Sequence, residues 1–178
     1  ALFVARRPHD RRGLFPARVG LAAIALACLL PAPRADLWRT DLETPPGIAS
    51  GSATAAIPDD AVVLVLPYSF QGNGMYWQAL SKMRWRMAGG YSAAAIPAEY
   101  APFPVVYALY GGALPANPRQ ELLRYLAYTG ATWVLVDARY PGPWAQFLRE
   151  AGGRPEDIGG VVRWRLDPAQ GRARASGA

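Results

Sequence analysis

The chain has 178 residues and is 52% hydrophobic and 18% charged, which fits one ordinary domain with an appendage and is too polar for a bundle of membrane spans. Its net charge of +6 lies at the two ends: five arginines against one aspartate in residues 1–18, and four against one in residues 163–178, while the 144 residues between them hold ten basic and eleven acidic groups. A nucleic-acid binder carries a basic stripe on its folded body, so this distribution predicts no nucleic-acid partner.

The first predicted elements are an arginine-rich loop over residues 1–13 and an uncharged apolar segment after Arg18. Only twelve residues separate Arg18 from Pro31, whereas a comfortable spanning helix has roughly 20 apolar residues. Three interpretations stay open: a buried core helix, a secretory signal peptide, and a short transmembrane helix over residues 14–33 whose arginine snorkels to the interface. We adopt the transmembrane helix. Arginine-rich ends stay in the cytoplasm, so residues 1–13 are expected inside and everything after Pro33 outside.

Residues 34–60 are rich in proline, glycine, serine and aspartate and predict a linker. The β-branched run "AVVLVLPY" at 61–68 then predicts a strand buried on both faces. It begins an α/β domain that we expect over residues 61–168.

The stretch "YWQALSKMRWRMAGGYSAAAIP", residues 76–97, is crowded with aromatic, methionine and arginine side chains. Apolar residues at helical spacing predict a helix with one buried face, made by Tyr76, Leu80 and Met83. The alternation in "RWRM" predicts that this helix ends near Met83 and that a short strand follows. The glycine pair after it indicates a backbone conformation that side chains forbid.

Four further elements follow. The sequence "NPRQELLRYLAYTG" predicts a helix capped by Asn117 and stopped by Gly130, and "TWVLVD" at 132–137 predicts a second buried strand. A second amphipathic helix is expected from Trp144, and "VVRWRLD" at 161–167 predicts an edge strand whose arginines face water.

The alternation of strands and helices favours a small α/β domain, with a mostly parallel sheet and flanking helices, preceded by one transmembrane helix. We expect the tail, residues 169–178, to be disordered.

No motif assigns a catalytic, cofactor-binding or metal-binding residue. The only histidine, His9, lies in the basic stretch and is best interpreted as a solvated loop residue. The "GNGMYW" segment lacks the third glycine of a dinucleotide fingerprint and favours a simple turn.

Four residues are candidate ligand contacts: Arg84, Arg86, Tyr91 and Asp137. The two arginines flank a tryptophan and are suited to clasp an anion such as phosphate, or they form the solvated face of a strand. Asp137 ends a strand, where ligand-facing residues of α/β sheets often lie, although a loop-starting aspartate also caps the next turn.

Three motifs in order resemble the C-terminal end of bacterial polytopic membrane proteins of the GT-C glycosyltransferase superfamily. They are "VVLVLPY" (62–68), "WQALSKMRWRMAGGYSAAAIP" (77–97) and "LLRYLAYTGATWVLVD" (122–137). In such proteins a last transmembrane helix leads through a linker into a small extracytoplasmic domain. The resemblance covers residues 14–167 and consists of fold motifs without a reaction signature.

The resemblance implies a parent enzyme in the inner or plasma membrane that moves a sugar from a polyprenyl-phosphate donor to an extracytoplasmic acceptor. The catalytic acidic residue of that superfamily lies in the first extracytoplasmic loop, which this chain does not contain. The chain is therefore expected to be a non-catalytic C-terminal fragment without cofactors. Its expected partners are the lipid bilayer, the rest of the parent protein, and a lipid-linked sugar or its acceptor.

Two other functions remain open from the sequence. One is a membrane-anchored or secreted α/β binding module without enzymatic activity, and the other is an intracellular soluble α/β enzyme whose apolar helix lies in a core.

Overall fold

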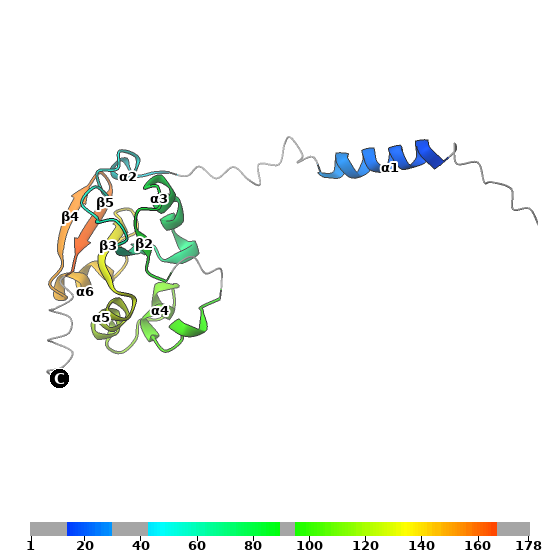
Figure 1. Cartoon of the computed structure of the whole chain (residues 1–178). Helices are drawn as coiled ribbons and strands as arrows, with labels where there is room; N and C mark the ends of the chain where they lie inside the picture. The colour runs from blue at the N-terminus through cyan, green and yellow to red at the C-terminus, as the bar shows by residue number, and fades with distance from the viewer. Residues whose placement is uncertain (1–13, 30–42, 90–94, 167–178) are drawn as a thin grey trace, which may run out of the picture. The chain divides into compact units, whose positions relative to one another are not determined.

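The computed structural model describes residues 14–29, 43–89 and 95–166, and the chain divides into two compact units, Ala1–Asp41 and Leu42–Ala178 (Figure 1). The predicted loop at 1–13, the predicted tail at 169–178 and Tyr91 lie outside the described residues.

The first unit contains one helix, α1, Leu14–Leu29. Its 16 residues extend about 24 Å at 1.5 Å per residue, less than the roughly 30 Å of a bilayer's hydrocarbon core. Among the described residues, no helix is both long enough and apolar enough to cross a membrane. The structure therefore does not support the predicted transmembrane helix over 14–33.

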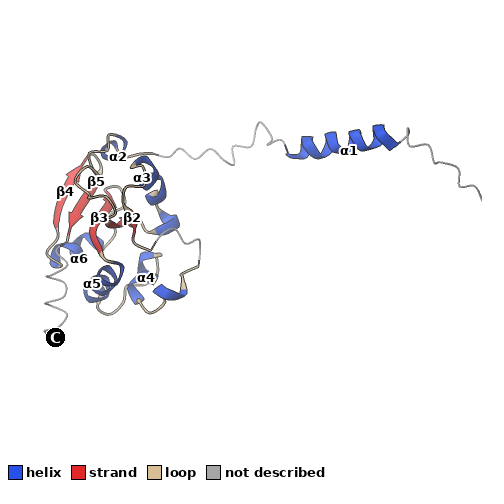
Figure 2. Ribbon diagram, viewed as in Figure 1, coloured by secondary structure: helices blue, strands red, loops and turns tan. Residues whose placement is uncertain are grey.

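The second unit is an α/β fold built on a five-stranded mixed sheet in the order β2-β1-β3-β5-β4 (Figure 2). The strands are β1 Val62–Leu66, β2 Arg86–Met87, β3 Ala131–Asp137, β4 Arg154–Ile158 and β5 Val161–Arg165. β1 pairs in parallel with β2 and β3, while β5 pairs antiparallel with β3 and β4.

The sheet is thus not mostly parallel as predicted. A hairpin of β4 and β5, joined by a two-residue turn, adds two antiparallel strand pairs to the two parallel ones. Gly159 and Gly160, with φ of 56° and 85°, join β4 to β5. Two consecutive residues of positive φ make the tight turn that only antiparallel strands can share. β4, which begins with "RP", takes the edge position predicted for β5.

Helices cover both faces of the sheet. They are α2 Pro46–Ala49, α3 Gly74–Leu80, α4 Pro104–Leu109, α5 Pro118–Thr129 and α6 Trp144–Glu150. Side chains of β1 alternate between two cores, with Val63 and Val65 in the cluster that includes α2 and α3, and Leu64 and Leu66 in the cluster that includes α4, α5 and α6. This alternation follows from the two-residue period of a strand.

The compact unit begins earlier than the predicted domain. Ile48, Ala53 and Ile57, in the stretch predicted as a linker, are no more than 3% exposed and belong to the α2–α3 cluster. Arg163 of β5 helps to fasten this stretch to the sheet, because its guanidinium donates to the Ala53 carbonyl at 3.1 Å and pairs with Glu156 at 2.6 Å. Arg163 is therefore buried, at 9% exposure, and does not face water as predicted.

The predicted buried face of the helix in 76–97 is wrong for Leu80 and Met83, while Tyr76 is partly buried and packs against the α2–α3 cluster. The fully buried residue of α3 is Trp77, whereas Leu80 and Met83 are 44% and 58% exposed. The helix ends at Leu80, and Lys82 and Met83 both take left-handed backbone with φ of 55°. Helical spacing does not extend through such a turn, so Met83 lies off the face that the pattern assigns to it.

Candidate functional site

The strand order creates a divergence point between the neighbouring strands β1 and β3. The chain leaves β1 toward α3 on one face of the sheet and leaves β3 toward α6 on the other. In open α/β sheets, ligands bind in the crevice outside the carboxyl ends of strands at such a point.

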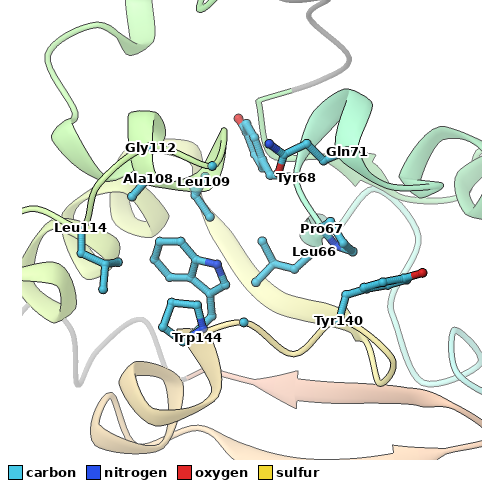
Figure 3. Close-up of a pocket in the computed structure, with 13 residues that line it drawn as sticks. Leu66, Pro67, Tyr68, Gln71, Ala108, Leu109, Gly112, Leu114, Tyr140 and Trp144 are labelled. Atoms are coloured by element: carbon cyan, nitrogen blue, oxygen red, sulfur yellow. The ribbon is translucent and has the colours of Figure 1, made fainter.

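A cavity of about 430 Å³ lies at this place (Figure 3). It is lined by residues of the β1 end and the following loop, of the α4 end and the following loop, and of the loop between β3 and α6. These residues are Leu66, Pro67, Tyr68, Gln71, Ala108, Leu109, Gly111, Gly112, Leu114, Tyr140, Gly142, Pro143 and Trp144. None of them carries a charge, so the cavity suits a neutral ligand.

Apolar and aromatic side chains form the inner wall of the cavity. In Figure 3 the Trp144 indole lies between Leu114 and Leu66, below Leu109, and Trp144 is 8% exposed. Leu66 and Leu109 are no more than 3% exposed. Rigid, buried walls of this kind preform the shape of a binding site.

The rim is more open. Tyr140 is 62% exposed and Leu114 is 44% exposed. Among the described residues of the lining, only Gln71 carries a side-chain amide, and its amide nitrogen donates to the Tyr110 carbonyl at 2.6 Å. This bond ties the loop after β1 to the end of α4.

Asp137 holds the loop that carries Tyr140 and does not line the cavity. It is 3% exposed, and its two oxygens accept hydrogen bonds from Nε and Nη2 of Arg139 at 3.0 and 2.8 Å. The Arg139 backbone N–H also donates to Asp137 at 3.1 Å. Hydrogen bonding to Asp137 raises the pKa of Arg139. Of the two interpretations, the structure favours the turn-capping aspartate.

Arg139 extends this support to two further residues. Its guanidinium forms an ion pair with Glu43, near the start of the second unit, and lies 5.6 Å from the centre of the Tyr140 ring. Arg139 thus links Asp137, through an ion pair, to the ring of the rim tyrosine.

Arg84 and Arg86 lie elsewhere, at the start of β2 and outside the cavity lining. Arg84 pairs with Asp59 at 3.2 Å and donates to the Thr54 carbonyl at 3.3 Å. Arg86 donates to the Asp60 carbonyl at 3.2 Å. The structure thus separates the arginines from Asp137, while Tyr91 lies outside the described residues.

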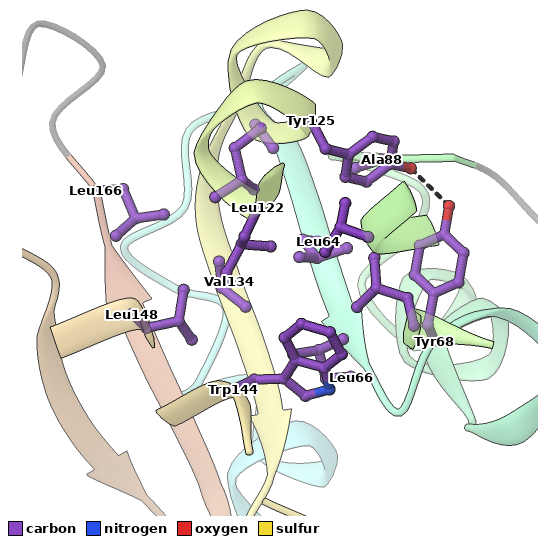
Figure 4. Packing of buried hydrophobic residues seen from close by; sticks show 14 of the residues in the cluster. Leu64, Leu66, Tyr68, Ala88, Leu122, Tyr125, Val134, Trp144, Leu148 and Leu166 are labelled. Carbon is purple, nitrogen blue, oxygen red and sulfur yellow. Dashed lines mark hydrogen bonds between the residues drawn. The ribbon is translucent and has the colours of Figure 1, made fainter. Parts of the chain in front are cut away.

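The cavity wall is fixed by two buried tyrosines (Figure 4). Tyr68, after β1, and Tyr125, on α5, are no more than 2% exposed, and their hydroxyl oxygens lie 2.6 Å apart. Burial raises the pKa of Tyr68 to about 12, and burial and the neighbouring Tyr68 raise that of Tyr125. Near neutral pH both hydroxyls therefore stay protonated and act as structural groups.

Gly89, of the glycine pair, packs directly on these hydroxyls. Its φ is +80°, and a Cβ added there would overlap the Tyr68 hydroxyl and lie 2.6 Å from that of Tyr125. Both the conformation and the contact require glycine, as the sequence predicts for this position.

The cavity residues were not found from the sequence, because they come from three loops that the fold brings together. The available signal was the aromatic and proline content directly after the two buried strands, in "PYSF" and "RYPGPW". In the described parts of the chain, no three histidine, cysteine, aspartate or glutamate side chains gather in a way that could hold a metal ion. With no carboxylate, imidazole or amine in its lining, the cavity can bind by shape and apolar contact.

No family model matches this chain, and no curated protein or solved structure matches it either.

The first prediction concerns Gly89. Gly89→Ala combines backbone strain with overlap of the tyrosine hydroxyls, so the free energy of unfolding in urea should fall by about 2–4 kcal/mol. The matched control is Gly130→Ala, because Gly130 has a φ of +71° and open space around the new Cβ. That change should cost only about 1–2 kcal/mol. Equal losses in the two variants would contradict the packing on the tyrosines.

The second prediction concerns pH. The pKa of Tyr68 is about 12 in the folded chain against an ordinary value of 10.0. The neutral Tyr68 hydroxyl therefore stabilises the fold fully below pH 10, and its contribution is lost as the pH rises from 10 through 12. We expect the free energy of unfolding to fall there by about 1.4 kcal/mol per pH unit for each such tyrosine. Tyr68→Phe should remove the part of this fall in the free energy of unfolding that Tyr68 causes. Tyr107→Phe, at a 53% exposed residue, should leave the fall unchanged.

Proposed function

We propose that this chain is the C-terminal, non-catalytic part of an integral-membrane glycosyltransferase of the GT-C type, which uses a polyprenyl-phosphate sugar donor. In this proposal residues 14–33 lie in the bilayer, and the α/β unit is extracytoplasmic and supports the membrane site or binds the acceptor. The partners are the bilayer, the rest of the parent protein and a lipid-linked sugar or its acceptor.

The observation that carries the proposal is the chemistry of α1. Residues 19–28 are all apolar or glycine, and every one of them is exposed. A helix that is apolar on all sides belongs in a protein core or in lipid, and the described part of its own unit offers no core. The helix is shorter than a bilayer's hydrocarbon core, so the proposal requires that residues beyond Leu29 also lie in the apolar layer.

The arginines before α1 support the proposed orientation of the chain across the membrane. Five arginines precede the apolar stretch that begins at Val19, and arginines next to a membrane helix favour the cytoplasmic side. The α/β unit would then lie on the periplasmic or extracellular side of an inner or plasma membrane.

The neutral cavity supports a binding role rather than a catalytic one for the α/β unit. Its lining offers aromatic faces and a side-chain amide but no acidic or basic group. Sugar transfer needs a general base, and the carboxylates, imidazoles and amines that serve this role near neutral pH are absent from the described lining. The proposal therefore locates the chemistry in the membrane part of the parent and gives the cavity to an uncharged portion of the acceptor or of the lipid-linked sugar.

The same cavity also favours a second candidate function, a membrane-anchored or secreted binding module with no enzymatic parent. A binding module needs a preformed pocket and no reacting group, and the cavity meets both conditions.

The coding sequence upstream of this chain distinguishes the glycosyltransferase fragment from the binding module. The reading frame upstream of Ala1 should encode at least about six further apolar spans and an acidic residue in the first loop outside the membrane. Sequencing the transcript that encodes this chain measures both. A start codon shortly before Ala1 would sink the glycosyltransferase proposal and leave the binding module.

A further inference from the structure

A second surface of the α/β unit combines exposed apolar and cationic side chains. We call it the α3 corner, and it consists of Leu80, Lys82, Met83, Arg84 and Arg86. Leu80 and Met83 are 44% and 58% exposed, and the three cationic residues are also exposed. Apolar side chains ringed by cations are typical of surfaces that touch anionic lipid.

The charges of the corner are only partly compensated. Lys82 has no acidic partner among the described residues, and the Arg86 side chain donates to a backbone carbonyl. Arg84 pairs with Asp59, whose side chain is 71% exposed. Exposed ion pairs of this kind contribute little to the stability of the fold. Counting Asp59 and Asp60 against the three cations leaves a net positive corner.

A cavity of about 500 Å³ opens beside these cations. Leu80, Lys82 and Arg84 line one side of it, and the turn after α2, with Ser50 and Thr54, lines the other. Cations and hydroxyl groups around an open hollow suit a phosphate group, which needs positive charge and hydrogen-bond partners.

Backbone strain is concentrated at this corner. Lys82 and Met83 have φ of 55°, and Asp60, whose N–H donates to the Arg84 carbonyl at 2.6 Å, has φ of 62°. Of the four non-glycine residues with positive φ in the described ranges, only Ser69 lies elsewhere. Strained backbone conformations of this kind persist only where the surrounding structure holds them, and they cluster at functional sites. Here the strain turns Met83 outward, away from the core beside Trp77.

We propose that the α3 corner docks on the surface of an anionic lipid bilayer, with Leu80 and Met83 entering the apolar layer and Lys82, Arg84 and Arg86 contacting lipid phosphates. The inference builds on the proposed membrane attachment through α1 and adds the surface by which the α/β unit meets the same membrane. It gives Arg84 and Arg86 a role separate from the neutral cavity.

The chain offers a direct probe, because Lys82 is its only lysine. The full chain is mixed with vesicles of phosphatidylcholine alone, or of an equimolar mixture with phosphatidylglycerol, and treated with a membrane-impermeant amine-acylating reagent. Peptide mapping separates Lys82 from the terminal amine. Docking should slow acylation of Lys82 by at least about threefold on the anionic vesicles relative to the free chain, and less on phosphatidylcholine.

Two variants at similarly exposed residues sharpen the test. Met83→Ser removes an apolar contact without changing charge, so the protection of Lys82 should fall toward that of the free chain. Tyr107→Ser, at a 53% exposed residue of α4, should leave the protection unchanged.

Other outcomes overturn the proposal in distinguishable ways. If the chain sediments with anionic vesicles but Lys82 reacts at the rate of the free chain, the corner does not dock, and attachment through α1 stands. If the chain does not sediment with either vesicle, both the corner and the attachment fail. Equal protection on the two vesicles would overturn the contact with anionic lipid.

Discussion

The end of β1 is held in place by one buried contact, in which the hydroxyls of Tyr68 and Tyr125 meet at 2.6 Å and the backbone of Gly89 packs on both. This contact joins the sheet to α5 and to the segment after β2. β1 lies between β2 and β3, and the cavity begins where β1 ends. The position of the cavity wall therefore depends on two side chains that are buried and stay neutral, and on a glycine that no other residue can replace without strain.

Two surfaces of different chemistry follow from this arrangement. The cavity at the divergence of β1 and β3 has an uncharged lining, and the α3 corner carries three cations beside two exposed apolar side chains. Behind the rim tyrosine, Arg139 pairs with both Asp137 and Glu43, and neither carboxylate lines the cavity. The two proposals above assign a neutral ligand to the cavity and anionic lipid to the α3 corner.

The elements that the sequence predicted well are those whose pattern is local. The β-branched runs of β1 and β3 and the stripe of α5, with its αL stop at Gly130, were found because burial on both faces or on one stripe leaves a clear trace. Left-handed residues at Lys82 and Met83 broke the helical pattern after α3, and the glycine hairpin before β5 was overlooked. Arg163 shows the remaining limit: its partners lie on β4 and more than a hundred residues earlier, so no local pattern predicts its burial. The cavity was missed for the same reason, because three loops build it.

We propose that the uncharged cavity is where the α/β unit binds its ligand, and the indole N–H signals of the tryptophans report on binding there. Trp144 lines the cavity, whereas Trp77, Trp85 and Trp164 are no more than 1% exposed. Titrating the chain with monomeric octyl glucoside, a neutral sugar on an apolar chain, should shift the Trp144 signal in a saturable way and leave those three in place. Saturable shifts at the buried tryptophans without one at Trp144, or no shift at any of the four, would show that the cavity does not bind such a ligand.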